Sequence, residues 1–447
     1  MTLDEVLRTL DENQIHRIKL GIFDIDGVLR GKYISRKKFE SSVLSGLGFC
    51  DVVFGWDVGD VLYDNVTFTG WKTGYPDATV RVDFSTLRLI PWEPGTALFL
   101  LDAYDKNGDL LGVAPRSVFR RVLDRAVSQG YDAFFAAEYE FFLFNETPHS
   151  LREKGYRHLT PLTPGMFGYS VVRASQNQQL VLDLFDQLTR FEIPLEGLHT
   201  ETGPGVYEAA INVDVGLAAA DKAALFKTAV KEICARHGLI ATFMAKWNPD
   251  LPGSGGHIHQ SLWDSDKQTN LFHHDGAMSD IMQNYVAGLV KNLPDLCVMF
   301  APTINSYKRA VPGAWAPVNA TWGVDNRTVA VRALPGSAKS ARVEMRACGA
   351  DLNPYLGMAA CLAAGLDGVD HQTDLPPAAE NAYAASNAPA LSRNLKEATE
   401  RFRRSELARQ WFGDSFVDHF AATRDWEVRQ HEKAVTDWEL SRYFEAI

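Results

Sequence analysis

Two glutamates stand one residue apart in an otherwise apolar run, Ala137-Glu138-Tyr139-Glu140-Phe141. If this run is a β-strand, the alternation of side chains places Glu138 and Glu140 on the same face. Two neighbouring carboxylates on a core-like strand repel each other unless a cation lies between them, and oxygen ligands suit hard divalent cations. The alternative is an edge strand with one face in water, because carboxylates usually face solvent.

Two further motifs contain residue types that bind metals. Glu201 and Glu208 flank a turn of Gly and Pro residues that can bring both carboxylates to one place. His257 and His259 follow a Gly-rich loop and share one face if they lie in a strand. Each motif alone is weak, because a glutamate in a Gly/Pro loop is usually solvated and a pair of histidines is usually structural.

A basic cluster follows in the last third of the chain. In Arg342-Val343-Glu344-Met345-Arg346, alternation puts three charged side chains on one face of a strand, which is costly unless ligands balance them. Guanidinium groups bind phosphates and carboxylates with two parallel hydrogen bonds. An acidic metal site beside an arginine-rich anion site is the combination that phosphoryl transfer from ATP requires. Other basic residues of this region are Arg309, Arg327, Arg332 and Lys339.

The elements that must position these residues fall into two groups. Short β-branched and aromatic runs between residues 18 and 103 predict a small strand-rich domain. A helix predicted after Pro115 and ending at Gly130 opens a larger domain, in which strands and helices alternate before a helical C-terminal region. We place the domain boundary between residues 108 and 109, which gives domains of residues 1–108 and 109–447. Expected strands in the larger domain are 133–144, 207–215, 328–334 and 342–345, and expected helices are 175–189, 218–237, 278–292 and 391–412.

Composition excludes several classes of protein. With 46% hydrophobic and 23% charged residues, the 447-residue chain is neither disordered nor fibrous. A formal net charge of -11 argues against a nucleic-acid partner. Five cysteines without CxxC spacing fit a reducing cytoplasm, and neither a signal peptide nor an 18-residue apolar run is found, so we expect no membrane partner.

Several of these motifs, in their order along the chain, resemble the glutamine synthetase family over nearly its whole length. The matching stretches are AAEYEFFLF, HTETGPGVYEAAINV, GSGGHIHQSL, NSYKRAVPG, DNRTVAVR and SARVEMRACGADLNPYLGMAACLAAGLDGV. The resemblance implies an α+β fold, with a β-grasp N-terminal domain and a catalytic domain built on a curved antiparallel sheet with helices. It also implies ATP as co-substrate and two or three Mg²⁺ or Mn²⁺ ions in each site.

The family pattern assigns roles to individual residues. It implies one metal held by Glu140, Glu201 and Glu208, and a second held by Glu138, His257 and Glu344. Arg309 and Arg346, with Gly253 beside them, resemble the residues that hold the substrate glutamate, and Arg327 resembles the arginine that stabilises the transferring phosphoryl group. The nucleotide-site positions are Glu196, His259, Ser261, Arg332, Lys339 and Arg342.

An intersubunit contact is also implied by the resemblance. Asp57 matches the family's aspartate that binds and deprotonates the incoming amine in the neighbouring subunit's active site. A homo-oligomer follows, a dodecamer of two stacked hexameric rings with active sites between subunits.

The sequence departs from glutamine synthetase where the amine must react. Trp315 stands in place of the flap glutamate that takes a proton from ammonium, after the turn Val311-Pro312-Gly313. An indole cannot accept that proton but offers an apolar wall. Pro252 replaces an asparagine and Asp60 a serine that the family pattern expects. Thr373 stands near the position at which some members have an adenylylated tyrosine. We therefore expect an organic amine as the acceptor of the γ-glutamyl group, with Trp315 in its binding site.

Other functions stay open from sequence alone. Trp315 can pack in the rearranged flap of an ordinary glutamine synthetase that uses ammonium, and the chain can be an inactive scaffold or sensor of this family. Asp24 and Asp26 mimic the DxDGV motif of phosphatases that use an aspartate nucleophile. The second acidic motif of such an enzyme follows here too soon for an intervening α/β core, so we interpret Asp24 and Asp26 as a turn at the end of a strand.

Overall fold

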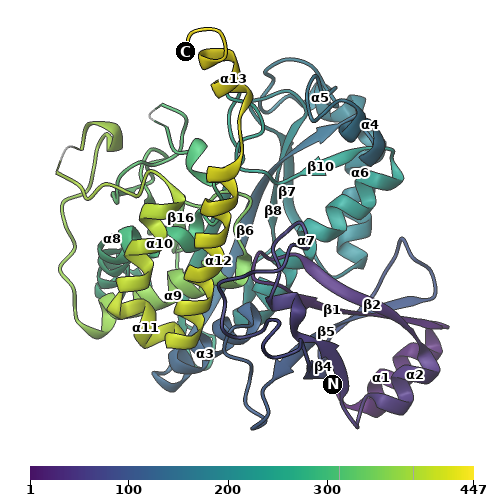
Figure 1. Ribbon diagram of the computed structural model, residues 1–447. Coiled ribbons are helices and arrows are strands. Elements are labelled where there is room, and N and C mark those ends of the chain that lie inside the picture. The colour runs from purple at the N-terminus through teal and green to yellow at the C-terminus, as the bar shows by residue number, and fades with distance from the viewer. Residues whose placement is uncertain (312, 386) are drawn as a thin grey trace.

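Two larger β-sheets organise the computed structural model, which describes residues 1–311, 313–385 and 387–447. Pro312, in the turn before Trp315, lies outside the described residues. The first sheet comes from the N-terminal quarter of the chain and the second from residues 131–345. In Figure 1 the N-terminal strands and α1 and α2 lie below the larger sheet, and α8–α12 gather at one side.

The N-terminal sheet has the strand order β2-β1-β5-β4-β3. β1 and β5 run parallel, and the other neighbours are antiparallel. Val6 and Leu10 of α1 and Phe39 of α2 are buried in the core of this sheet. The strand-rich start that the sequence predicted therefore also contains two helices that pack on the strands. The elements are α1 (Leu3–Glu12), β1 (Arg17–Phe23), β2 (Leu29–Ser35), α2 (Arg36–Ser42), β3 (Leu47–Cys50), β4 (Asp77–Leu89) and β5 (Thr96–Tyr104).

The larger sheet has the order β14-β15-β16-β11-β6-β8-β7, with β9 and β10 also paired to β6. Its neighbours are antiparallel, as expected, except that β14 and β15 run parallel. Its strands are β6 (Tyr131–Phe144), β7 (Leu195–Thr200), β8 (Val206–Ile211), β9 (Asp214–Val215), β10 (Ile240–Thr242), β11 (Gly256–Asp264), β14 (Trp322–Val324), β15 (Val331–Leu334) and β16 (Arg342–Met345).

Helices cover one face of this sheet. Tyr139 of β6 is fully buried and stacks on Phe226 of α7, with ring centroids 5.8 Å apart. Because side chains alternate along a strand, Glu138 and Glu140 point to the other face. The helices of the larger domain are α3 (Pro115–Ser128), α4 (Pro148–Glu153), α5 (Val171–Gln176), α6 (Gln178–Arg190), α7 (Gly216–Arg236), α8 (Asp280–Phe300), α9 (Pro354–Asp370), α10 (Leu395–Arg404), α11 (Glu406–Phe412), α12 (Asp414–Lys433) and α13 (Asp437–Tyr443).

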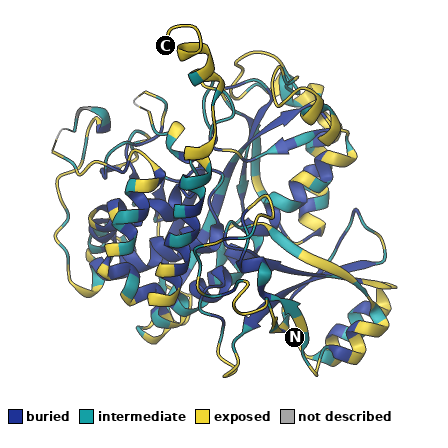
Figure 2. Ribbon diagram, viewed as in Figure 1, coloured by how far each residue is buried: buried dark blue, intermediate teal, exposed yellow. Residues whose placement is uncertain are grey.

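α9 is the longest of the helices that sequence patterning missed in the described part of the chain. It begins at the cap Asn353, whose side chain accepts a hydrogen bond from the Tyr355 N–H, and residues 354–368 are all buried. It packs against α3, α7 and α8 at the centre of the helical layer. Figure 2 shows this centre as mostly buried. A helix that is apolar all round has no 3.6-residue alternation to reveal it.

The Asp24-Ile25-Asp26 segment forms a turn after β1, as expected. The Asp24 carboxylate accepts the backbone N–H groups of Asp26 and Val28 and the Arg30 Nε–H. Asp26 accepts a hydrogen bond of 2.6 Å from Arg424 of α12. Both carboxylates therefore hold the structure together rather than facing a substrate.

α12 joins the C-terminal region to the N-terminal loops. Beside the Arg424–Asp26 pair, the Trp426 indole donates to Asp57 Oδ2 at 2.9 Å, and Arg429 pairs with Asp64 on the surface. The Arg424 side chain is buried, so its ion pair is shielded from screening by salt. These contacts fix residues 24–64 against a helix that lies more than 350 positions later.

His419 of α12 makes this contact sensitive to acid. It is 4% exposed, it packs edge-on against Phe68 with ring centroids 5.9 Å apart, and burial lowers its pKa to about 4. The unfolded chain, with a histidine pKa near 6.5, binds the proton first as pH falls, so stability is full above about pH 6.5 and falls toward pH 4. We expect a loss of about 2–3 kcal/mol across this window.

Urea unfolding between about pH 7 and pH 4.5 measures this loss, with His419→Gln as the comparison because an amide does not titrate. The difference between the two proteins isolates His419 from the carboxyl groups that also titrate. Equal pH dependence in both proteins would contradict the expectation.

None of the helices in the described part of the chain combines the length and apolarity needed to cross a membrane. The boundary at residues 108 and 109 stays a prediction. It lies in the connection between β5 and α3.

Candidate active site

The strand register gathers charged side chains on the face of the sheet opposite α7. Glu138 of β6 lies directly across from His257 of β11, and Glu140 lies across from Glu208 of β8. Glu344 of β16 lies across from both His259 of β11 and Arg332 of β15. Residues far apart in the sequence thus meet because five neighbouring strands present them at the same level.

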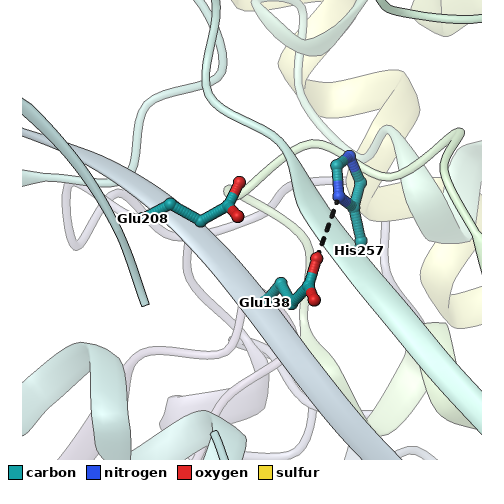
Figure 3. Close-up of side chains that lie close together, drawn as sticks. All are labelled: Glu138, Glu208 and His257. Atoms are coloured by element: carbon teal, nitrogen blue, oxygen red, sulfur yellow. Dashed lines mark ion pairs between the residues drawn. The ribbon is translucent and has the colours of Figure 1, made fainter. Parts of the chain in front are cut away.

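Carboxylate oxygens and imidazole nitrogens come close enough there to share a cation. His257 Nδ1 lies 3.6 Å from Glu138 Oε2 and 3.4 Å from Glu344 Oε1, and His259 Nε2 lies 3.1 Å from Glu138 Oε1. Figure 3 shows Glu138, Glu208 and His257 converging from three strands. In each of two groups, Glu138 with Glu208 and His257, and Glu138 with His259 and Glu344, one ligand atom per residue lies within 4.8 Å of the others.

Burial and neighbouring charges shift the pKa values of the glutamates in and beside the cluster. Burial favours the neutral form of Glu140 and raises its pKa, helped by the charge of Glu208 and opposed by His257 and Arg309. Burial also acts on Glu138 and Glu344, but the neighbouring histidines outweigh it: the pKa of Glu138 lies well below its usual range, and that of Glu344 falls to about 2. Carboxylate oxygens held this close together suit a hard divalent cation, because such a cation prefers oxygen ligands.

The two groups only partly match the ligand sets expected from the sequence. Glu138 belongs to both groups, and His259, expected at the nucleotide, stands among the carboxylates. Glu140 lies outside both groups in this structure and accepts the Gly255 N–H, next to the cluster. The division of ligands between individual ions stays a prediction.

Glu201 reaches the cluster through the β7–β8 hairpin. His199 of β7 places Nε2 3.2 Å from Glu208 Oε1 and Nδ1 3.8 Å from Glu201 Oε1, so both carboxylates of the HTETGPGVYE motif meet at one imidazole. The turn between them contains Gly205, with φ of +71°, where an added Cβ would lie 2.6 Å from the Leu143 carbonyl oxygen. The hydrogen bond from His199 to Glu208 raises the histidine pKa.

Sequence reasoning missed His199 and Tyr169. The Tyr169 ring stacks on His199 with centroids 4.3 Å apart, and burial with the charges of Glu201 and Glu208 raises the pKa of its phenol. A backbone hydrogen bond from Tyr169 to Thr200 fixes this position. The HTE motif gave a signal for His199, but Tyr169 comes from an irregular segment that no periodicity marks.

The arginines divide into buried and rim positions. Arg332 and Arg346 both donate to the fully buried Glu344 carboxylate. Arg309 is 7% exposed, and burial lowers its pKa. Its guanidinium donates no hydrogen bond to any other described residue, so its N–H groups can bind the carboxylate of a ligand. Arg327 is exposed, and its carbonyl oxygen accepts a bond from the Arg346 Nε–H.

The expected nucleotide residues are spread around the cluster. Arg342 Nε donates to His259 Nδ1 at 3.1 Å, which ties these two positions together. Ser261 accepts from the Trp263 indole and points along the same strand. Glu196 on β7 and Lys339 in the loop before β16 are exposed. Contact of these residues with ATP remains a prediction.

The remaining predicted residues, Gly253, Trp315 and Asp57, lie in three different settings. Gly253 packs against Arg309, since an added Cβ would lie 2.8 Å from Arg309 Cγ, whereas Trp315 is 64% exposed with φ of +55°. Asp57 Oδ1 accepts the N–H groups of Gly59 and Val61, and its Oδ2 accepts the Trp426 indole. In the described part of the chain, none of its side-chain hydrogen bonds reaches the cluster.

Comparison with known proteins identifies the family. Residues 112–443 match the family described as glutamine synthetase, catalytic domain. The chain is 47% identical to "Type-1 glutamine synthetase 2" of Dictyostelium discoideum over 99% of this chain and 86% of that protein. It is 40% identical to "Glutamate--isopropylamine ligase" of a Pseudomonas species over 98% and 97%. A solved structure of a GmaS/ADP complex superposes with a TM-score of 0.86 at 27% identity, covering 99% of each chain. The chain belongs to the glutamine synthetase family, with the fold expected from its motifs.

Proposed function

We propose that this protein ligates an organic amine to the γ-carboxylate of L-glutamate at the expense of ATP, through γ-glutamyl phosphate, giving a γ-glutamyl amide, ADP and phosphate. The observation that carries the proposal is that the carboxylate–histidine cluster lies beside the buried Arg309, which bonds to no other described residue through its guanidinium: a Cβ added to Gly255 would lie 2.8 Å from His257 Nε2 and 3.0 Å from an Arg309 guanidinium nitrogen. The 40% identical relative named for ligation of isopropylamine to glutamate supports the same chemistry.

In this proposal the chain's residues bind and orient the reactants. Arg309 and Arg346, with Gly253, hold the carboxylates of glutamate, and Arg327 at the rim neutralises charge on the phosphoryl group in flight. Mg²⁺ or Mn²⁺, when bound, supplies charge neutralisation for the phosphate oxygens. Glu140, Glu201 and Glu208 hold one ion, and Glu138, His257 and Glu344 another. The nucleotide is held by Glu196, His259, Ser261, Arg332, Lys339 and Arg342.

The second candidate is an ordinary glutamine synthetase that uses ammonium, and the name of the 47% identical relative favours it. Trp315 favours the organic amine, because an exposed indole offers apolar surface and no proton acceptor. From the sequence, Trp56 and Tyr63 would suit a small monoamine and Asp60 and Asp64 a polyamine. In the structure Tyr63 is buried against Trp426 and Arg30 lies over the Trp56 ring, so these two aromatic residues add little to the case for a monoamine. In this structure Asp60 binds Arg30 and Asp64 binds Arg429, which weakens the case for a polyamine.

The test is phosphate release with ATP and glutamate against ammonium, methylamine, ethanolamine, isopropylamine, aniline and putrescine. An organic amine with the highest kcat/KM supports the proposal, and ammonium with the highest value identifies a glutamine synthetase. Absence of phosphate release that depends on both glutamate and an amine would identify an inactive scaffold or sensor.

If an organic amine is preferred, Trp315→Glu is expected to shift the kcat/KM ratio toward ammonium, because a carboxylate restores a proton acceptor in the flap. The shift should be about a hundredfold, the lower end of what one general acid or base contributes. Trp315→Phe, which keeps an apolar wall, is the matched control. An unchanged ratio in Trp315→Glu would leave the flap without a role in amine choice.

We further propose that active sites form between subunits of a dodecamer. Asp57 belongs to the N-terminal loop and does not bond to its own chain's cluster within the described residues, so in this proposal it serves a neighbour's site. Asp57→Ala and Arg327→Ala homo-oligomers should each be nearly inactive, and mixed rings should regain activity through sites in which both residues are intact. Mixed rings shown by mass to contain both subunits, yet inactive, would contradict shared sites.

A further inference from the structure

Three chain segments meet beneath Arg309, and Asp351 lies where they join. The segments are 253–256, which leads into β11, 303–309, which ends at Arg309, and 348–352, which follows β16. Two backbone bonds join the first segment to the third, from Ala350 N–H to Ser254 O at 3.0 Å and from Gly256 N–H to Cys348 O at 3.1 Å. A third, from Gly349 N–H to Phe300 O at 3.2 Å, ties the third segment to the end of α8, just before the second segment.

The Asp351 carboxylate is bound by the turn that carries Arg309. Its Oδ2 accepts the Ser306 hydroxyl at 2.6 Å and the Thr303 hydroxyl at 2.8 Å. Thr303 and Ser306 also bond to each other's backbone N–H groups, at 3.0 and 3.1 Å. The backbone N–H of Arg309 donates to the Ser306 carbonyl oxygen, so the position of Ser306 determines the position of the Arg309 backbone.

Neighbouring groups leave this carboxylate little freedom. Its Oδ1 is buried, and a Cβ added to Gly349 would lie 2.4 Å from that atom. The ammonium of Lys227 in α7 donates a hydrogen bond to the Leu352 carbonyl oxygen, and its charge attracts the Asp351 carboxylate. On the far side of the turn, Asn305 exchanges two hydrogen bonds of 2.8 Å with the backbone of Lys246, near the Gly253 loop.

We infer that Asp351 is a positioning residue for glutamate, which holds the Thr303–Ser306 turn so that the Arg309 guanidinium lies along Gly253–Gly255 and meets the substrate carboxylate. The inference rests on the proposed function. Asp351 is separated from the substrate by this turn and acts only through Arg309.

Asp351→Ala is expected to raise the KM for glutamate by about ten- to a hundredfold, the cost of misplacing a substrate-holding group by about 1 Å, with the KM for ATP within about twofold of wild type. Asp351→Asn keeps an oxygen acceptor for the hydroxyls and should recover part of the loss. Ser306→Ala removes one of the two hydroxyl bonds and should raise the same KM to a smaller extent, so the inference stays testable if Asp351→Ala folds poorly.

Two comparisons separate positioning from general damage. Asp367 of α9 is a buried carboxylate bound by Asn292 and Lys291, away from Arg309, so Asp367→Ala should lower stability while leaving the KM for glutamate unchanged. In an Arg309→Ala background, adding Asp351→Ala should change that KM no further, because the group through which Asp351 acts is gone.

The outcomes distinguish this inference from the proposed function. If Arg309→Ala raises the KM for glutamate but Asp351→Ala and Ser306→Ala do not, or if they raise the KM for ATP equally, the positioning role is overturned. If Arg309→Ala leaves glutamate binding unchanged, the assignment of Arg309 in the proposed function fails first.

Discussion

Glu140→Ala is expected to lower turnover by about two to three orders of magnitude, the scale on which a preorganised charge partner contributes to catalysis. Glu140 faces Glu208 across β6 and β8, and burial together with the charge of Glu208 raises its pKa, so a cation beside the two carboxylates would favour their ionised forms. If Glu140 holds a divalent ion as proposed, Glu140→Ala removes one charged ligand and weakens the charge neutralisation that the ion would supply to phosphoryl transfer.

Phosphate release at saturating ATP, glutamate and the preferred amine measures this effect, and calorimetric titration with Mn²⁺ measures the lost ion affinity. Glu146→Ala is the matched control, because Glu146 is a buried carboxylate just beyond the end of β6 that binds Ser150, Lys154 and the Thr160 N–H. Activity near wild type in Glu140→Ala would remove this residue from the metal site.

Glu344→Ala is expected to lower the free energy of unfolding by about 3–5 kcal/mol, the cost of removing one partner from a buried ion pair. The carboxylate is 0% exposed and accepts from Arg332 and Arg346, while His257 and His259 lie on its other side. Without it, the buried Arg346 loses its carboxylate partner and Arg332 keeps only its ion pair with the exposed Asp325.

Urea unfolding of the two proteins at neutral pH measures the difference. The double variant Glu344→Ala with Arg332→Met removes one of the unbalanced charges and should recover part of the loss, since an apolar replacement of a buried pair is often tolerated. A loss below about 1 kcal/mol in Glu344→Ala would mean that water or another anion replaces the carboxylate.

The sequence predicted several strands of the sheet that holds the site, and also the helices that are α6, α7 and α8 in the structure. The runs around Glu138, His257 and Glu344 alternate with period two, so both their strand conformation and their shared face could be predicted. α9 stayed hidden because its residues are apolar in every direction. The position of Trp315 in a flap came from resemblance alone, and the structure places it exposed in an irregular segment.

Register is what the sequence could not supply. That Glu138 contacts both histidines follows from the pairing of β6 with β11, and no local pattern fixes which residues of two distant strands lie opposite each other. Tyr169 is a similar case. Its stacking on His199 depends on a segment 30 positions away, and its residue type gave no signal.

The contacts of α12 with the N-terminal loops set an order for folding during synthesis. Asp26 and Asp57 leave the ribosome hundreds of residues before Arg424 and Trp426, so the contacts of these loops with α12 cannot form in the early part of synthesis. The first sheet can form early, because its strands all lie within the first 104 residues. The loop that carries Asp57 gains its contacts with α12 only when nearly the whole polypeptide has been made, and a chain that stops short of residue 424 keeps only the loop's contacts within the N-terminal region, such as those with Arg30.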